Sequence, residues 1–308
     1  MKLSIVVPCY NEEKNVSLFY DEFVRVFKKI KGDYEFVFVN DGSRDNTFIE
    51  LKKLCDMKTS NIKVVNFSRN FGKEAAMYAG LKEASGEYVS LVDADLQQRP
   101  EVLLNMYETL IEDDSYDCVA AYQESRSEGF VLKFFKDCFY KLINKISDVD
   151  FVRGASDFRV FKRSVRDSII ELGENNRFTK GIFSFVGYKT HFMPYKAEER
   201  ANGVSNWSFV SLFKYAISGI VAFSTLPLKI STFLGGLTLI GSFIYLIVAL
   251  ILNVNVTTMM LFFLLSFFSG VQLLVIGVFS HYMSVMYSEV KKRPIYIAKD
   301  VISVSKKK

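Results

Sequence analysis

Short apolar segments rich in β-branched and aromatic residues alternate with amphipathic segments along the first part of the chain. The apolar segments have the length and composition of buried strands, and they cover residues 3–7, 34–39, 62–67, 88–92 and 118–122. The segments between them have helical periodicity and cover residues 16–30, 47–57, 73–84 and 100–111. This alternation predicts an α/β fold of Rossmann-like type with a mostly parallel sheet, whose ligands bind beyond the carboxyl ends of the strands.

The second part of the chain contains a long region without charge. No Asp, Glu, Lys or Arg occurs between Lys229 and Glu289, and this gap of roughly 60 residues has room for two spans of about 20 to 25 residues each. Because a pair of core helices would normally carry a polar face, we expect a two-helix transmembrane hairpin over 229–290, with spans near 230–252 and 257–280. The apolar segment before it, 207–228, is interpreted as an amphipathic interfacial helix.

Basic residues on both sides of this hairpin indicate its orientation. Lys229 precedes it and a Lys-Lys-Arg cluster at 291–293 follows it, so both ends are expected in the cytoplasm. The chain is then a multi-pass protein of the cell membrane, with a cytoplasmic domain over 1–206 and a basic cytoplasmic tail over 291–308. The net charge of +5 is modest, and the tail suits anionic lipid better than nucleic acid. The four cysteines lack metal-type spacing and are expected to be reduced thiols.

The segment "DADLQ" directly follows the fourth predicted strand. On extended backbone Asp93 and Asp95 project to the same side, where their negative charges repel each other. Mg²⁺ or Mn²⁺, which prefer oxygen ligands and are commonly shared with substrate phosphates, would relieve that repulsion, with Gln97 as a further oxygen donor. The alternative is an acidic turn or a helix N-terminus, where Asp is also favoured.

The other strand-to-helix loops carry polar residues that suit a nucleotide. Asp41 follows the second strand and is expected to share a crevice with Asp93, whereas Gly42, Ser43 and Asp45 are interpreted as an ordinary turn and helix cap. Arg69 and Lys73 in the third loop are placed to meet a bound phosphate, or to be solvated charges. The chain has neither a G-x-G-x-x-G motif after its first strand nor a phosphate-loop lysine motif, which argues against a dinucleotide enzyme and a phosphate-loop ATPase.

Taken in order, the segments "VVPCYNEEKN", "VNDGSRDNT", "SRNFGKEAAMYAGLKEASGEYV", "DADLQ" and "DFRVF" resemble the inverting family 2 glycosyltransferases with the GT-A fold. The similarity runs from Leu3 to about Pro227, and the branch it resembles most is that of the polyprenyl-phosphate glycosyltransferases, which includes bactoprenol glucosyltransferases and dolichyl-phosphate mannose synthase. It implies transfer of a hexose, with inversion, from a nucleotide-diphosphate sugar to undecaprenyl or another polyprenyl phosphate, for later transfer outside the cytoplasm. The donor stays open among UDP-glucose, UDP-N-acetylglucosamine and GDP-mannose, with the two UDP-sugars favoured, and a homo-oligomer such as a tetramer is expected.

The resemblance also implies roles for individual residues. The nucleotide and its sugar are expected to contact Pro8, Tyr10, Glu12, Asp41, Asp93 and Ala94. The metal is expected at Asp95 and Gln97, with Asp93 nearby. The residues expected to carry the transfer are Asp93, Asp157, Arg126, Lys133 and Arg200, the last three as contacts of the lipid phosphate.

Further segments of the resemblance concern the acceptor and the membrane. Phe178 and Gly181 belong to a stretch expected to shape the acceptor side, and Ser205 and Trp207 to one that leads to the membrane. The chain departs from the family pattern at Asn40, Gln98, Arg99, Gln123 and Asn206, which puts the choice of donor and the detail of phosphate binding in question.

An ionised lipid phosphate needs no general base, so Asp157 is expected to orient a basic residue or the sugar. The alternative is a structural acid paired with Arg159 or Arg153. Two other functions remain open. One is a processive polysaccharide synthase, which the absence of a Q-x-x-R-W motif disfavours, and the other is an inactive nucleotide-binding assembly protein of the membrane.

Overall fold

The computed structural model describes residues 2–28, 33–57, 61–123, 155–196 and 258–305, with scattered positions between 228 and 251. Its strands are β1 (Leu3–Cys9), β2 (Tyr34–Asn40), β3 (Asn61–Phe67), β4 (Tyr88–Leu91), β5 (Cys118–Gln123), β6 (Ala155–Lys162), β7 (Thr190–Tyr195) and β8 (Ala298–Val304). Its helices are α1 (Val16–Phe27), α2 (Thr47–Met57), α3 (Lys73–Glu83), α4 (Pro100–Glu112), α6 (Arg163–Glu171), α7 (Thr179–Phe185) and α10 (Thr258–Val290).

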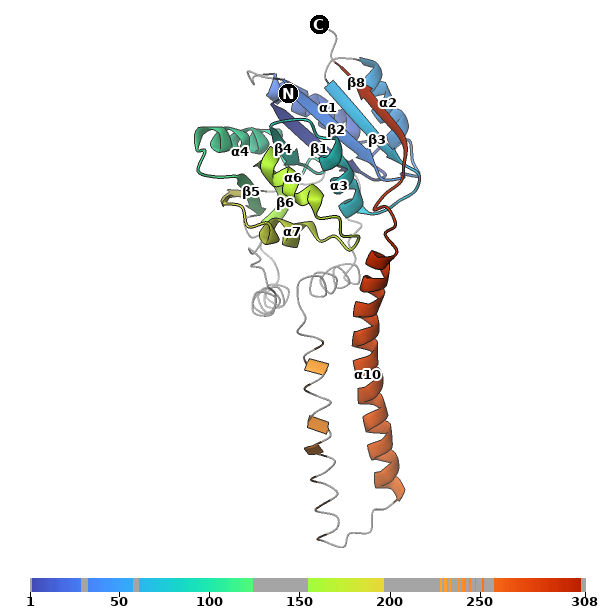
Figure 1. Ribbon diagram of the computed structural model, residues 1–308. Coiled ribbons are helices and arrows are strands. Elements are labelled where there is room, and N and C mark those ends of the chain that lie inside the picture. Colours follow the sequence, from blue (N-terminus) through green and yellow to red (C-terminus); the bar gives the residue numbers. More distant parts are fainter. Residues whose placement is uncertain are drawn as a thin grey trace.

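The strands form one eight-stranded sheet in the order β7-β5-β6-β4-β1-β2-β3-β8 (Figure 1). In this described sheet only β6 and β8 run against the other strands. The mostly parallel α/β fold predicted from the sequence is therefore confirmed. The predicted strands and helices are present with small differences at their ends, as at α1, which ends at Phe27 instead of residue 30.

Helices cover both faces of the sheet, which explains why its central strands are apolar on both faces. One core lies between the sheet and α1, α2 and α4, and includes Phe19, Phe36 and Met106. A second core lies against the other face and includes Met77 of α3, Ile169 of α6 and Ile182 of α7. α3 approaches the sheet closely at Gly80, where a Cβ atom would lie 2.2 Å from Val6 Cγ1. Helix α3, on this second face, begins with Lys73 at the edge of the sheet.

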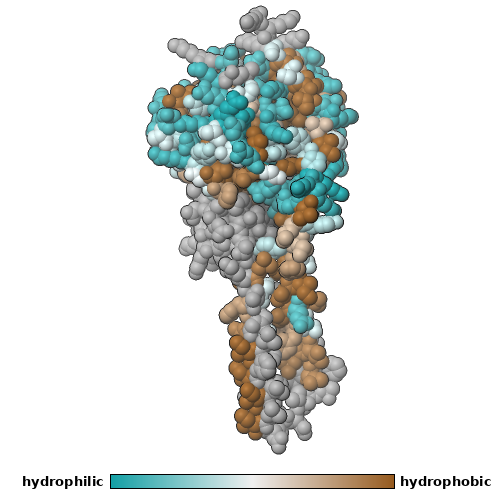
Figure 2. Space-filling view, viewed as in Figure 1, coloured by the Kyte–Doolittle hydropathy of each residue, from teal (hydrophilic) through white to brown (hydrophobic). Residues whose placement is uncertain are grey.

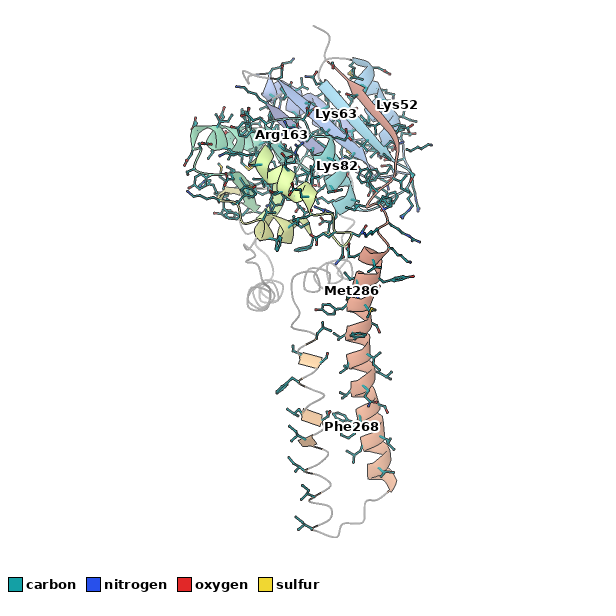
Figure 3. The ribbon with its side chains drawn as sticks, viewed as in Figure 1. Lys52, Lys63, Lys82, Arg163, Phe268 and Met286 are labelled. Carbon is teal, nitrogen blue, oxygen red and sulfur yellow. The ribbon has the colours of Figure 1, made fainter. Side chains whose placement is uncertain are left out.

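The helix α10 projects from the sheet domain as a single long element (Figure 1). It extends to Val290, beyond the predicted end of the second span at 280, because residues 281–288 remain uncharged and compatible with a helix. Within the described residues, Phe267–Val290 is the one helix long and apolar enough to cross a membrane, by length and composition. Its apolar side chains are exposed (Figure 2), and Phe268 and Met286 project from it in Figure 3.

Only part of the predicted membrane region can be compared with the structure. The described positions between 228 and 251 are helical, and the first predicted span stays a prediction. The turn of the hairpin and nearly all of the predicted interfacial helix over 207–228 lie outside the described residues. The two-helix hairpin as a whole therefore stays a prediction.

The C-terminal segment returns to the sheet, which the sequence analysis did not predict. β8 pairs antiparallel with β3 and covers the edge of the sheet, with Asp300 opposite Asn66. Tyr296 stacks on Phe67 at 4.8 Å between ring centroids. Part of the segment expected to be only a basic tail thus belongs to the same sheet as the candidate site (Figure 1).

Candidate active site

The antiparallel pairing of β4 with β6 brings two acids together at the carboxyl edge of the sheet, where the parallel strands end. Leu91 pairs with Arg159 in this ladder. Continuing the register by two residues sets Asp157 opposite Asp93, just beyond the last residue of β4. The register therefore explains how two acids separated by more than 60 residues in the sequence reach one place.

Lys73, the first residue of α3, lies between these two acids. Its Nζ is 2.7 Å from Asp93 Oδ1 and 3.5 Å from Asp157 Oδ2. Desolvation lowers the pKa of Lys73, but the two carboxylates outweigh it and raise that pKa above its ordinary value. The lysine is therefore a fixed cation at neutral pH, and its side chain is 39% exposed to solvent.

Asp157 forms no ion pair with Arg159, the one of its two expected arginine partners that lies within the described residues. Burial raises the pKa of Asp157, but the larger combined effect of Lys73, Lys180 and Arg159 lowers it below its ordinary value, so the carboxylate stays ionised. Arg159 instead donates to the Ser156 carbonyl and stacks on Phe183, and no Asp157–Arg159 ion pair occurs among the described residues; Arg153 lies outside them. Asp157 Oδ1 is buried and has no hydrogen-bond partner in the described structure. A buried acceptor without a donor costs stability, and this makes the oxygen a candidate for contact with a substrate.

The "DADLQ" loop has a tightly held backbone. Leu96 adopts φ +62°, an uncommon conformation for a residue with a Cβ atom, and Gln97 N–H donates to Asp95 Oδ1 at 3.2 Å. Gln98 accepts the Asp93 N–H at 2.9 Å and donates to Asp93 Oδ2 at 3.3 Å. The family departure at Gln98 therefore supports Asp93, the same carboxylate that holds Lys73.

Asp41 joins the second and third loops. Its carboxylate accepts the N–H groups of Phe71 and Gly72, at 2.7 and 3.0 Å, and the side-chain amide of Asn70. Burial raises its pKa despite these bonds. The next residue must be glycine, because Gly42 has φ +60° and a Cβ there would lie 2.2 Å from the Arg69 carbonyl carbon. Asp41 thus positions the loop that leads into Lys73, and its contact with a nucleotide stays a prediction.

The first loop is held by the second loop and, indirectly, by β8. Asn11, with φ +56°, donates its N–H to Ser43 Oγ, and Ser43 Oγ donates to Asn40 Oδ1. Asn40 donates to Asn66, which donates to Asp300 of β8. An amide at position 40, where the family pattern favours Asp, therefore connects this loop with the C-terminal strand.

The remaining predicted nucleotide residues lie at the same edge. Pro8 is the next-to-last residue of β1, and Tyr10 and Glu12 follow that strand. Ala94 is buried between Asp93 and Asp95. Glu12 Oε2 accepts the side-chain amide of Asn15 at 2.6 Å. Asp45 Oδ1 accepts the Thr47 N–H at the start of α2, which confirms the predicted cap.

Some of the other predicted basic and acceptor-side residues lie within the described residues and some lie outside them. Arg69 is exposed and stacks on Phe71, and the departure at Arg99 forms an ion pair with Glu22 of α1. Phe178 and Gly181 are buried at the start of α7. Arg126, Lys133, Arg200, Ser205, Trp207 and Asn206 lie outside the described residues.

Glu74 is a residue of this region that the sequence analysis missed. Its Oε2 accepts the N–H of Thr179 at 2.9 Å and also the Thr179 hydroxyl. Burial and the nearby Asp157 raise the pKa of Glu74 to about 7. Its position next to Lys73 was the available signal, but a Glu in the first turn of a helix is ordinarily explained by the helix dipole.

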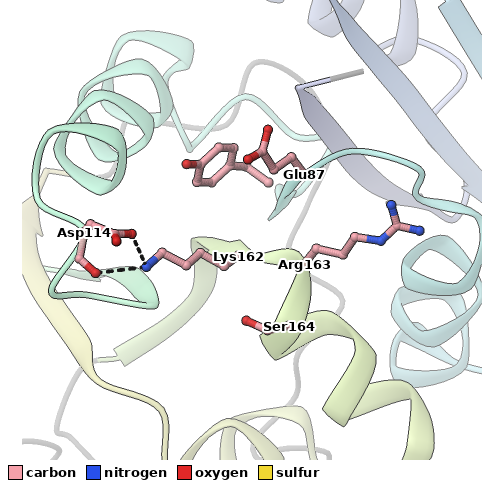
Figure 4. Close-up of a pocket in the computed structure, with 6 residues that line it drawn as sticks. Glu87, Asp114, Lys162, Arg163 and Ser164 are labelled. Carbon is pink, nitrogen blue, oxygen red and sulfur yellow. Dashed lines mark hydrogen bonds and ion pairs between the residues drawn. The ribbon is translucent and has the colours of Figure 1, made fainter.

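A polar pocket at the opposite edge of the sheet does not include any predicted site residue. It is lined by Glu87, Tyr88, Asp114, Lys162, Arg163 and Ser164 (Figure 4). Lys162 is already bound by Asp114 at 2.7 Å. We therefore assign the candidate site to the carboxyl edge.

Comparison with known proteins agrees with this geometry. In an open α/β sheet, ligands bind beyond the carboxyl ends of the strands, where the charged loops of this protein lie. Residues 4–170 match the family described as glycosyl transferase family 2. The chain therefore belongs to this family and is a glycosyltransferase.

Relatives match along nearly the whole chain. The SfII prophage-derived bactoprenol glucosyl transferase of Shigella flexneri is 39% identical, covering 97% of this chain and 98% of the relative. The uncharacterized glycosyltransferase sll0501 of Synechocystis is 39% identical, covering 98% and 96%. Mannosyl-3-phosphoglycerate synthase from Rubrobacter xylanophilus superposes with a TM-score of 0.50 at 17% identity, covering 71% of this chain and 72% of that one, and this likeness concerns the fold alone.

Proposed function

We propose that this glycosyltransferase moves a hexose from a nucleotide-diphosphate sugar to a polyprenyl phosphate such as undecaprenyl phosphate, with inversion at the anomeric carbon. The observation that carries the proposal is Lys73, a fixed cation between Asp93 and Asp157, in a protein that also has an exposed apolar helix. The name of the Shigella flexneri relative supports a bactoprenol acceptor and a glucosyl donor. UDP-glucose and UDP-N-acetylglucosamine are the proposed donors, and the product would be available for later transfer outside the cytoplasm.

The chemistry fits the charges at the carboxyl edge. An oxygen of the acceptor phosphate attacks the anomeric carbon, and the bond to the donor diphosphate breaks with its electron pair leaving on the nucleoside diphosphate. We propose that Lys73, a cation beside Asp93, stabilises that growing negative charge. Because the acceptor is already ionised, no proton has to be removed, and Asp157 serves to hold Lys73 and the sugar. Arg126, Lys133 and Arg200 are proposed as contacts of the acceptor phosphate.

A divalent cation fits the residues of the "DADLQ" loop. No group of three or more His, Cys, Asp or Glu suited to a metal occurs within the described residues. Asp95 and Gln97, with Asp93, offer oxygen donors for Mg²⁺ or Mn²⁺, whose remaining ligands would be diphosphate oxygens of the donor. When bound, the ion would stabilise the departing diphosphate.

The acceptor would be reached at the membrane. We propose that α10 belongs to the predicted hairpin, that the protein is a multi-pass protein of the cell membrane, and that both termini are cytoplasmic. The exposed apolar side chains of α10 would also allow a homo-oligomer.

The test uses the purified full-length protein in lipid nanodiscs, with a panel of UDP- and GDP-sugars. We expect release of nucleoside diphosphate, and a sugar-bearing lipid by mass spectrometry, only when undecaprenyl phosphate is present. Undecaprenol, which lacks the phosphate, is the matched control, and excess chelator is expected to stop the reaction. Efficient transfer to a soluble oligosaccharide would reject the lipid acceptor, and nucleotide binding without transfer would favour the inactive assembly protein.

A further inference from the structure

Glu289 is an unusual residue for its position on α10. It is the first charged residue after the uncharged stretch 230–288, and it lies one residue before the end of the helix. The negative end of the helix dipole disfavours an acid there, and the residues that follow, Lys291, Lys292 and Arg293, have the favoured sign. A carboxylate at this place therefore needs another partner.

That partner is a segment of the catalytic domain between α6 and α7. Glu289 Oε1 accepts the backbone N–H groups of Asn175 and Asn176, at 2.8 and 3.1 Å. Its Oε2 accepts the side-chain amide of Asn175 at 3.3 Å. The end of α10 and this segment are consequently fixed to each other by charge-assisted hydrogen bonds, which are stronger than neutral ones.

We name residues 175–179 the bridging segment, because a second carboxylate holds its other end. Thr179 donates its N–H and its hydroxyl to Glu74 of α3. Between the two ends, Arg177 is buried with its guanidinium 4.4 Å from the centroid of the Tyr78 ring, also on α3. The residue before Glu74 is Lys73, so the segment connects the end of α10 with the first turn of the helix that carries the site cation.

We propose that Glu289 is a positioning residue that sets the acceptor side of the site through the bridging segment. A lipid acceptor reaches the enzyme along the membrane, and the bridging segment is one described connection between α10 and α3, beside the contact of Tyr296 with Tyr78 of the same helix. Loss of the Glu289 contacts releases one end of the segment, while Asp41, Asp93 and Gln98 continue to hold the donor loops. The inference rests on the lipid acceptor of the proposed function and assigns it a residue outside the nucleotide site.

Two substitutions separate the contact from the charge. Glu289→Ala removes all three hydrogen bonds. Glu289→Gln removes the charge, but its one carbonyl oxygen can still accept both backbone N–H groups, because in the structure both meet the same oxygen. Val290→Ala is the matched control, since it shortens the neighbouring side chain, which is 73% exposed.

The experiment measures steady-state kinetics with undecaprenyl phosphate and UDP affinity for each full-length variant in nanodiscs, with amide hydrogen exchange over 175–179. For Glu289→Ala we expect the acceptor KM to rise about ten-fold, UDP affinity to stay within about two-fold, and the segment to exchange faster. Val290→Ala is expected to stay within about two-fold of the wild type in every readout, and Glu289→Gln to fall between Val290→Ala and Glu289→Ala, because it keeps the backbone contacts but makes them neutral.

The outcomes distinguish the two proposals. If the wild type does not use undecaprenyl phosphate, the proposed function fails, and hydrogen exchange still reports whether Glu289 fixes the segment. If the wild type is active and Glu289→Ala leaves the acceptor KM unchanged, or weakens donor and acceptor equally, the positioning role is overturned. A Glu289→Gln variant as impaired as Glu289→Ala would also overturn it, because the contacts would then not be the cause.

Discussion

The two edges of the sheet each contain an acid beside a lysine, and the hydrogen bonds of the two acids differ. At the amino edge, Glu35 of β2 is 1% exposed, and its Oε1 accepts the hydroxyls of Ser4 and Ser85, both at 2.6 Å, and the Ser85 N–H at 2.7 Å. Lys63 lies 3.6 Å from its other oxygen. At the carboxyl edge, Asp157 has one oxygen near Lys73 and one buried oxygen with no partner in the described structure.

We interpret this as the difference between a structural acid and an acid proposed to act in the site. Every donor around Glu35 is committed to the fold, so its removal should reduce stability. Asp157 Oδ1 has no donor within the described residues, at the edge of the sheet where a substrate is proposed to bind, so removal of this acid should reduce turnover. Replacing the carboxylate by an amide at each of the two edges tests this comparison.

The largest effect is expected for Asp157→Asn. The variant keeps the shape of the side chain but loses the charge that holds Lys73, so we expect transfer to fall about 100- to 1,000-fold. The melting temperature should stay near that of the wild type, because the lost carboxylate was incompletely bonded. Initial rates at saturating donor and acceptor measure the effect. Asp114→Asn, at a side chain that is 95% exposed, is the control. Full activity in Asp157→Asn would remove this acid from the site.

Glu35→Gln is expected to show the opposite pattern. The new amide nitrogen faces Lys63, so the lysine loses its counter-charge, and we expect a loss of about 1 to 3 kcal/mol in the free energy of unfolding. Turnover per folded molecule should not change. Thermal denaturation followed by an activity assay measures both quantities, and Glu50→Gln, in a surface pair with Lys53, is the control. Reduced turnover at an unchanged melting temperature would contradict the assignment of Glu35 to structure.

The sequence predicted the carboxyl-edge site to different degrees in different loops. Asp93 and Lys73 could be found because each directly follows an apolar strand or a strand-to-helix loop, and strand ends are where α/β folds bind ligands. The meeting of Asp157 with Asp93 depends on the register of β6, an antiparallel strand inserted between β4 and β5, which periodicity does not encode. The family resemblance supplied that residue instead.

The C-terminal region could be predicted only in part, for a related reason. The absence of charge over 230–288 was enough to indicate α10. The return of β8 depends on the open edge of β3, more than 200 residues earlier in the chain, and nothing in the local pattern of 298–304 identifies that partner. The same holds for Glu289, whose role follows from contacts with 175–176 and not from its neighbours in the sequence.

The smallest effect is expected at Glu74, which shares features with both acids. It accepts hydrogen bonds from Thr179, as Glu35 does from its serines, and it is also near Asp157. Burial and Asp157 raise its pKa from 4.5 to about 7, against the opposing effects of Thr179 and Lys73. The folded protein therefore binds more protons than the unfolded chain between these values, and stability falls as pH rises from about 4.5 to about 7. Glu74→Gln keeps an oxygen for Thr179 and cannot ionise, so its melting temperature relative to the wild type should increase between pH 5 and pH 8. Melting curves at both values measure this, with Glu50→Gln as the control. A difference that is the same at both pH values would mean that the protonation of Glu74 does not change between them, and a pKa of about 7 for this residue would be contradicted.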